Sequence, residues 1–172
     1  FGNLWQSDND DGGSPAVRIN QVFEFGDHGY RSIVRSKGPI TGADPRPEVA
    51  HWHQNDPGVV PNLLLTGTGA PTGITVYEGD LLPQRYRGQL LHTDAGPNIV
   101  RSYAPISQGA GYTAKTLPVA HANLSWFRPS DVTVAPDGSI FVADWLDPAC
   151  GGHRAMATRG GRIYRISPPN TN

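Results

Sequence analysis

Glycine and proline interrupt this sequence so often that long helices have little room to form. The chain holds 21 glycines and 16 prolines among its 172 residues. Proline removes a backbone donor and clashes inside a helix, and glycine costs conformational entropy within any regular element. No segment shows a sustained helical period with capping residues at its ends. We therefore expect an all-β fold with long loops.

The clearest strands form a hairpin near the C-terminus. Residues 131–134 (DVTV) and 139–142 (SIFV) are rich in β-branched residues and nearly alternate, and the sequence APDG separates them. Proline presets φ and Asp-Gly tolerates a positive φ, so this sequence predicts a tight turn. Further strands are expected at residues 16–25, 72–78, 87–93, 98–104 and 161–166, whereas residues 1–15, 31–62 and 106–125 are predicted as loops, the last with at most one strand near 112–117.

Two segments repeat one plan. RGQLLHTDAGPNIVRSY and GSIFVADW…GRIYRIS each give an apolar strand that ends in an acid, a Gly/Pro loop, and a strand of the form Ile-x-Arg. Such repeats favour the blades of a β-propeller, which take about 40–50 residues each. Residues 1–172 would then form one partial propeller domain of roughly three blades. Since a closed propeller needs about four or more blades, we expect this chain to be a piece of a longer protein.

Charge and composition exclude several functions. The formal net charge is −1, which gives no general attraction to nucleic acid or to an anionic membrane. No apolar run approaches the roughly 18 residues of a membrane span. Cys150 is the single cysteine, so an internal disulfide and a CxxC motif are excluded.

Two polar clusters are candidate metal sites. Asp8, Asp10 and Asp11 lie in an acidic segment, and hard cations such as calcium prefer several carboxylate and carbonyl oxygens; the segment could equally be a solvated loop. In HWHQND, His51 and His53 would point to the same side of an extended segment near Asp56. These three could bind a transition metal, act as acid and base, contact a quinone, or form ordinary hydrogen bonds within a loop.

A third group of polar residues lies at strand ends. Asp94 and Asp144 stand where predicted strands run into Gly/Pro loops, while Arg128 and Asp131 begin the C-terminal hairpin. In a propeller such positions can face a channel or a binding surface. The alternative is a structural ion pair between blades, formed by Arg128 with Asp131 or Asp144.

The order of these motifs resembles a known family. RINQVFEFGDHGYRS, PTGITVYEGDLLPQRYRGQLL and RPSDVTVAPDGSIFVADW are similar to the C-terminal half of the membrane-bound dehydrogenase domain of planctomycete-type bacteria and to soluble glucose/aldose sugar and sorbosone dehydrogenases. The resemblance covers nearly the whole chain and implies a six-bladed β-propeller that uses pyrroloquinoline quinone (PQQ) and calcium. In that family the acidic segment resembles a calcium-binding loop. Arg128 matches one of two arginines that bind PQQ carboxylates, and Ser130 stands at the other.

The resemblance implies a PQQ-dependent dehydrogenase that oxidises a hydroxyl or aldehyde of a sugar or alcohol, with Arg128, Asp94, Asp131 and Asp144 at the cofactor. Two other functions stay open: a non-catalytic extracellular propeller that binds or scaffolds, and a calcium-dependent lactonase-like hydrolase that uses the three aspartates. The expected partners are a small substrate and either the rest of the propeller or another chain. The expected location is periplasmic or extracellular, with membrane association of the intact protein as an option.

Overall fold

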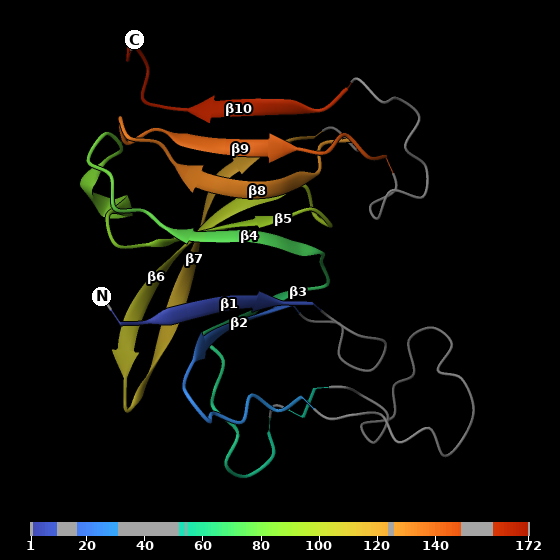
Figure 1. Cartoon of the computed structure of the whole chain (residues 1–172), viewed down its shortest axis with the longest axis vertical. Coiled ribbons are helices and arrows are strands. Elements are labelled where there is room, and N and C mark those ends of the chain that lie inside the picture. Colours follow the sequence, from blue (N-terminus) through green and yellow to red (C-terminus); the bar gives the residue numbers. More distant parts are fainter. Residues whose placement is uncertain are drawn as a thin grey trace. The chain divides into compact units, whose positions relative to one another are not determined.

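The computed structural model describes residues 2–9, 17–30, 52–53, 55–123, 126–148 and 160–171. These residues form ten β-strands and one short 3-10 helix, η2 (Gln84–Tyr86), and the strands make three sheets with antiparallel pairing (Figure 1). The described part of the chain contains no α-helix. The all-β prediction is therefore confirmed. Two compact units can be distinguished, Phe1–Gly69 with Ser107–Thr113, and Ala70–Ile106 with Ala114–Asn172.

The first unit holds a three-stranded sheet with the order β1-β2-β3. Its strands are β1 (Leu4–Asp8), β2 (Val17–Val22) and β3 (Leu64–Gly67). Trp5 pairs with Gln21 at one end of the β1–β2 ladder, and Asp8 pairs with Arg18 at the other. The prediction of a loop over residues 1–15 was wrong at residues 4–8, and β3 was not predicted. β1 has no strong local strand pattern, and β3 pairs with β2, which lies far away in the sequence.

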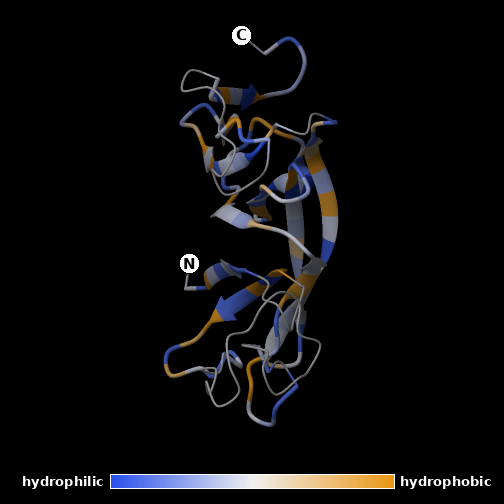
Figure 2. Cartoon of the chain, turned by 90° about the vertical axis from the view of Figure 1, so that its right-hand side faces the viewer, coloured by the Kyte–Doolittle hydropathy of each residue, from blue (hydrophilic) through white to orange (hydrophobic). Residues whose placement is uncertain are grey.

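A four-stranded sheet with the order β4-β5-β6-β7 lies mostly in the second unit, and its segment Ser107–Thr113 belongs to the first. Its strands are β4 (Pro71–Val76), β5 (Leu90–Asp94), β6 (Ile99–Gln108) and β7 (Gly111–His121). Short bands of hydrophobic and of hydrophilic residues occur along the strands (Figure 2). The strand allowed near 112–117 is present as β7, whereas the loop predicted for the rest of residues 106–125 was wrong where β6 and β7 extend into it.

The C-terminal sheet has the order β10-β9-β8 and also belongs to the second unit. Its strands are β8 (Pro129–Val134), β9 (Ile140–Asp144) and β10 (Arg162–Ile166). The predicted turn is present: the Ala135 N–H donates to Ser139 O at 2.8 Å, and Gly138 adopts a φ of 82°. The hairpin prediction is confirmed.

One hydrophobic core joins the two sheets of the second unit. Leu91 and Val100 from β5 and β6 belong to the same buried cluster as Val132, Ile140 and Val142 from β8 and β9. β4 also lies very close to β8, since a Cβ added at Gly73 would lie 2.8 Å from Asp131 Cα. Each fully buried aliphatic side chain of such a core stabilises the fold by about 1.5–3 kcal/mol.

Candidate functional site

Seven of the ten candidate site residues fall in the described part of the chain. They are Asp8, His53, Asp56, Asp94, Arg128, Asp131 and Asp144. The other three, Asp10, Asp11 and His51, lie outside the described residues, so their predicted metal-binding roles stay predictions.

Arg128 lies just before β8, and its guanidinium donates hydrogen bonds to oxygen atoms of two loops. Nη1 donates to Ala95 O at 2.9 Å, to Gly96 O at 3.4 Å and to Asn98 Oδ1, all in the β5–β6 turn. Nη2 donates to Pro148 O at 3.4 Å, beyond the end of β9. These acceptors are all uncharged, and no ion pair of Arg128 occurs among the described residues. The half-buried guanidinium therefore has no carboxylate partner among those residues.

Asp144 fixes the backbone around Arg128 rather than pairing with its side chain. Its Oδ1 accepts the backbone N–H of Arg128 at 2.9 Å and that of Leu146 at 3.0 Å. Its Oδ2 is buried and has no hydrogen-bond partner in the described structure. The expected alternative, an ion pair of Arg128 with Asp131 or Asp144, is absent from the described residues.

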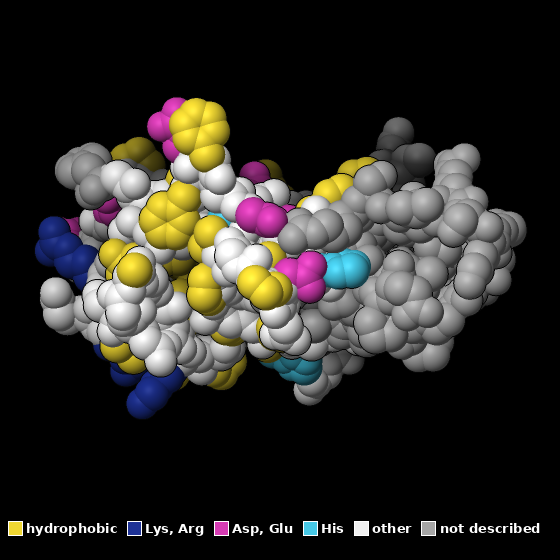
Figure 3. All heavy atoms as spheres, turned by 90° about the horizontal axis from the view of Figure 1, so that it is seen from below, with side chains coloured by type: hydrophobic (Ala, Val, Ile, Leu, Met, Phe, Trp, Pro, Cys, Tyr) yellow, Lys and Arg dark blue, Asp and Glu magenta, His cyan; other side chains and the backbone are white. Residues whose placement is uncertain are grey.

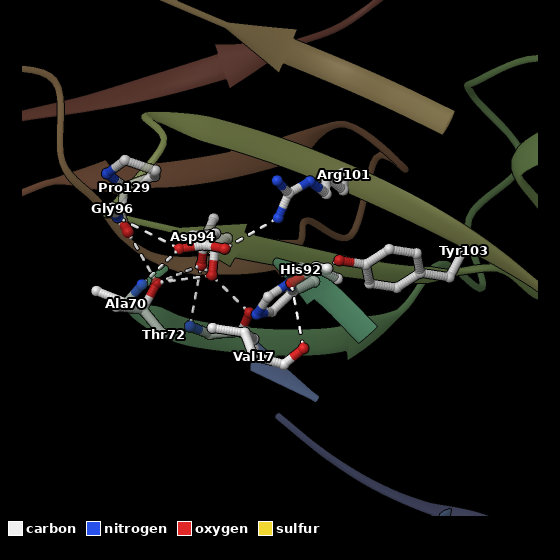
Figure 4. A network of polar contacts seen from close by, with 12 residues as sticks. Val17, Ala70, Thr72, His92, Asp94, Gly96, Arg101, Tyr103 and Pro129 are labelled. Atoms are coloured by element: carbon white, nitrogen blue, oxygen red, sulfur yellow. Dashed lines mark hydrogen bonds and ion pairs between the residues drawn. The ribbon is translucent and has the colours of Figure 1, made fainter. Parts of the chain in front are cut away.

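Asp94, the last residue of β5, is fully buried inside a polar network (Figure 4). Its Oδ1 accepts the N–H groups of Ala70 at 2.8 Å and Gly96 at 3.3 Å. Its Oδ2 accepts a hydrogen bond from Arg101 Nη1 at 2.9 Å, which completes an ion pair. The Gly96 contact ties Asp94 to the same turn that holds Arg128. In this chain the Asp94 carboxylate therefore shapes the turn, and its contact with a cofactor stays a prediction.

The network continues along β5 and β6 through residues that the sequence analysis did not select. His92 lies two residues before Asp94 and opposite Arg101 in the ladder, so the three side chains share one face of the sheet. His92 Nδ1 lies 2.9 Å from Tyr103 Oη. The repeated Ile-x-Arg pattern was the available signal for Arg101. No sequence pattern pointed to His92, because it lies beside Arg101 only when β5 and β6 pair.

Burial shifts the pKa values of this network strongly. Desolvation, with the nearby Arg101 charge as a second cause, lowers the pKa of His92 from 6.5 to about 4. Desolvation also raises the pKa of the Tyr103 hydroxyl to about 12, although Arg101 opposes the shift. Both groups are therefore neutral near pH 7.

Of the remaining candidates, His53 and Asp56 lie close to each other, whereas Asp131 and Asp8 have other surroundings in the described structure. Asp131 is exposed, and its Oδ1 accepts the Val132 N–H at 2.8 Å. His53 Nδ1 lies 3.5 Å from Asp56 Oδ2. At the end of β1, desolvation is the main cause that raises the pKa of Asp8.

A metal site does not assemble within the described residues. No group of three His, Cys, Asp or Glu side chains there is placed to hold a metal ion. The lactonase-like alternative would need Asp94, Asp131 and Asp144 around one ion, so the described structure does not favour it. The described part of the chain also contains no helix of the length and hydropathy needed to cross a membrane.

Comparison with solved structures reveals the same fold in sugar dehydrogenases. The chain is similar to a glucose dehydrogenase (TM-score 0.66, 16% identity, 96% of this chain and 41% of that chain). It is also similar to the soluble aldose sugar dehydrogenase of Escherichia coli in its apo form (TM-score 0.63, 19% identity, 96% and 41%). A candidate oxidoreductase (glucose dehydrogenase) from Thermus thermophilus aligns as well (TM-score 0.65, 16% identity, 95% and 41%). The chain therefore spans less than half the length of these proteins.

These similarities confirm the fold prediction. The three antiparallel sheets correspond to roughly three blades of a β-propeller. No curated protein sequence matches this chain significantly. The model of a domain family of unknown function, DUF7133, matches residues 45–170. The chain therefore belongs to the DUF7133 family and has part of the β-propeller fold found in glucose and aldose sugar dehydrogenases.

Proposed function

We propose that this chain is part of a quinone-dependent dehydrogenase that oxidises a hydroxyl or aldehyde group of a sugar or alcohol. The single observation that carries the proposal is the environment of Arg128. Its guanidinium is half-buried, four uncharged oxygens orient it, and no carboxylate among the described residues neutralises it. A cation fixed in this way suits a carboxylate-bearing ligand such as PQQ.

The proposal involves two cofactors, PQQ and calcium, and the described residues fit PQQ better than calcium. Arg128 fits an anionic quinone, because Nη2 makes a single long contact to Pro148 O and can turn toward a carboxylate. Calcium has no comparable support, since Asp8 is the one acidic residue of its segment within the described part. We therefore assign no chemical step to calcium, and its binding by Asp8, Asp10 and Asp11 stays a proposal.

The residues of this chain would act on the cofactor by positioning it. Asp144 holds the backbone N–H of Arg128, and the β5–β6 turn holds Nη1, so the guanidinium loses little freedom when it binds an anion. Asp94 stabilises that turn through the N–H of Gly96. When bound, the quinone would supply the two-electron acceptor for the oxidation. The same proposal places the protein in the periplasm or outside the cell, with the rest of a propeller or a second chain as its structural partner.

Calorimetric titration of the intact protein that contains this domain tests the role of Arg128. We expect PQQ to bind, and we expect Arg128→Met to weaken the affinity tenfold to a hundredfold, because charge-assisted hydrogen bonds contribute about 1.5–3 kcal/mol. Repeating the titration with a calcium chelator measures the contribution of calcium.

The matched control is Arg85→Met, which removes an exposed arginine from the same unit. This variant should bind PQQ as the wild type does. If the folded wild-type protein binds no PQQ, or if both variants lose affinity equally, the proposal is wrong.

A further inference from the structure

A large cavity is formed wholly by residues of the first unit. Its volume is about 750 Å³, which falls within the range of about 300–1,000 Å³ usual for ligand sites. Its walls come from β1, β2, the segment before β3 and the tip of the β6–β7 hairpin. Figure 3 shows hydrophobic side chains gathered on the face seen from below, where that segment and the hairpin tip lie in Figure 1.

Three aromatic side chains give this cavity apolar walls. The rings of Trp5 and Tyr112 meet edge to face with centroids 5.5 Å apart, and Phe23 is 41% exposed. An aromatic ring presents a negative face, which attracts polarised C–H groups as well as apolar surface. The ring of a sugar has such C–H groups on its faces and hydroxyl groups around its rim. A flat ligand with an apolar face therefore suits these walls.

A buried amide gives the same cavity an unused hydrogen-bond acceptor. Gln21 lines the cavity and is 8% exposed. Its Nε2 donates to Asn3 Oδ1 at 2.7 Å, and Asn3 Nδ2 in turn donates to Tyr112 Oη at 3.3 Å. These two hydrogen bonds orient the Gln21 amide. Gln21 Oε1 has no hydrogen-bond partner in the described structure. A buried acceptor without a donor is costly, so a ligand hydroxyl placed there would bind favourably.

We propose that this cavity binds the ring of a neutral hexopyranoside, with the sugar face on Trp5 and a hydroxyl group donating to Gln21 Oε1. None of the described residues that line the cavity is charged, which disfavours a phosphorylated or otherwise ionic ligand. Trp5 and Gln21 pair at the opposite end of the β1–β2 ladder from Asp8. The site is thus separate from the acidic segment and does not depend on the proposed quinone function.

The test is calorimetry of the intact protein with methyl β-D-glucopyranoside and methyl β-D-galactopyranoside. The methyl group caps the anomeric oxygen, so neither compound can be oxidised at that carbon, and no quinone is added. We expect saturable binding of at least one glycoside. We also expect a shift of the Trp5 indole N–H resonance, which a Trp5→Phe variant assigns. Cyclohexanol, which has an apolar ring and a single hydroxyl, should bind at least tenfold more weakly.

Two variants distinguish an effect on glycoside binding from an effect on folding. Gln21→Met keeps the side-chain length and removes the acceptor, so it should weaken glycoside binding tenfold to a hundredfold while the urea midpoint stays near that of the wild type. Phe25→Asn is the matched control: Phe25 is 98% exposed, lies outside the cavity and has a positive φ that asparagine tolerates. The proposal is overturned if the folded wild type binds neither glycoside, if cyclohexanol binds equally well, or if Gln21→Met lowers stability and leaves binding unchanged.

Discussion

Two arginines of the second unit each pair with an aspartate, in different surroundings. Arg101 Nη1 lies 2.9 Å from the fully buried carboxylate of Asp94, whereas Arg165 Nη2 lies 2.8 Å from Asp137 at the surface. Water screens the exposed pair, so it adds little to stability. Removing one partner of the buried pair would leave an uncompensated charge, at a cost of about 3–5 kcal/mol. Asp94 and Arg101 are therefore important to the fold, whatever ligand the neighbouring turn binds.

His92 should make the stability of the domain depend on pH. The folded chain binds a proton at His92 only near pH 4, whereas the unfolded chain binds it near pH 6.5. The free energy of unfolding is therefore highest above pH 6.5 and should fall by about 3 kcal/mol as the pH decreases from 6.5 to 4. His92→Gln cannot take up this proton and should reduce the pH dependence.

Urea denaturation at several pH values between 7 and 4 measures this dependence. His121→Gln, which replaces an exposed histidine at the end of β7, is the control and should keep the slope of the wild type. An equal slope for wild type and His92→Gln would show that His92 is not the group responsible.

In the second unit, β4 and β8 pack so closely that the packing requires glycine at position 73. β4 and β8 belong to different sheets, and Thr72 Oγ1 of β4 donates to Pro129 O of β8 at 2.8 Å. At the next position, a Cβ added to Gly73 would lie 2.8 Å from both Asp131 Cα and Val132 N. These are backbone atoms, so a larger residue cannot be accommodated by a side-chain rotation.

Gly73→Ala should therefore destabilise the second unit by about 1–3 kcal/mol. Gly111→Ala at the start of β7, in the Ser107–Thr113 segment of the first unit, offers a comparison at an uncrowded glycine, because an added Cβ there meets no atom within 4 Å and the φ is not positive. That change should be neutral or slightly stabilising, since alanine reduces the freedom of the unfolded chain. Thermal and urea denaturation of both variants provide the measurement, and equal effects would contradict close packing of β4 on β8.

In the C-terminal sheet, one edge of the outer strand β10 has no partner strand among the described residues. β10 pairs with β9 alone among the described strands, and Ile163 and Tyr164 on it are 73% and 36% exposed. An exposed edge that carries apolar side chains is a template for another strand. The chain also spans 41% of the glucose dehydrogenase structures that share its fold. We therefore propose that β10 contacts a further strand, from the same protein or from a second copy.

Sedimentation velocity tests this edge. The chain of 172 residues should associate as its concentration increases, and Ile163→Lys should weaken that association, because lysine on an edge strand opposes pairing. Phe25→Lys places the same charge on an exposed residue outside the strands and should have no effect. Association that persists unchanged in Ile163→Lys would show that β10 is not the contact.

Features that depend on a few neighbouring residues could be predicted from the sequence. The density of glycine and proline excluded long helices, and the APDG turn with its two alternating strands predicted the β8–β9 hairpin. The strand-loop-strand repeat in the sequence indicated a propeller. These predictions succeeded because turn chemistry and strand alternation are set within a short window of sequence.

Strand pairing and the burial of polar groups depend instead on how distant segments fold together. β1 and β7 have weak local patterns, and each becomes a strand through its pairing with β2 and β6, respectively. The partners of Arg128 come from turns about thirty and twenty residues away, and the low pKa of His92 arises from burial across a ladder. Burial and charge pairing depend on many contacts between segments that are distant in sequence. A short window of sequence therefore cannot predict them.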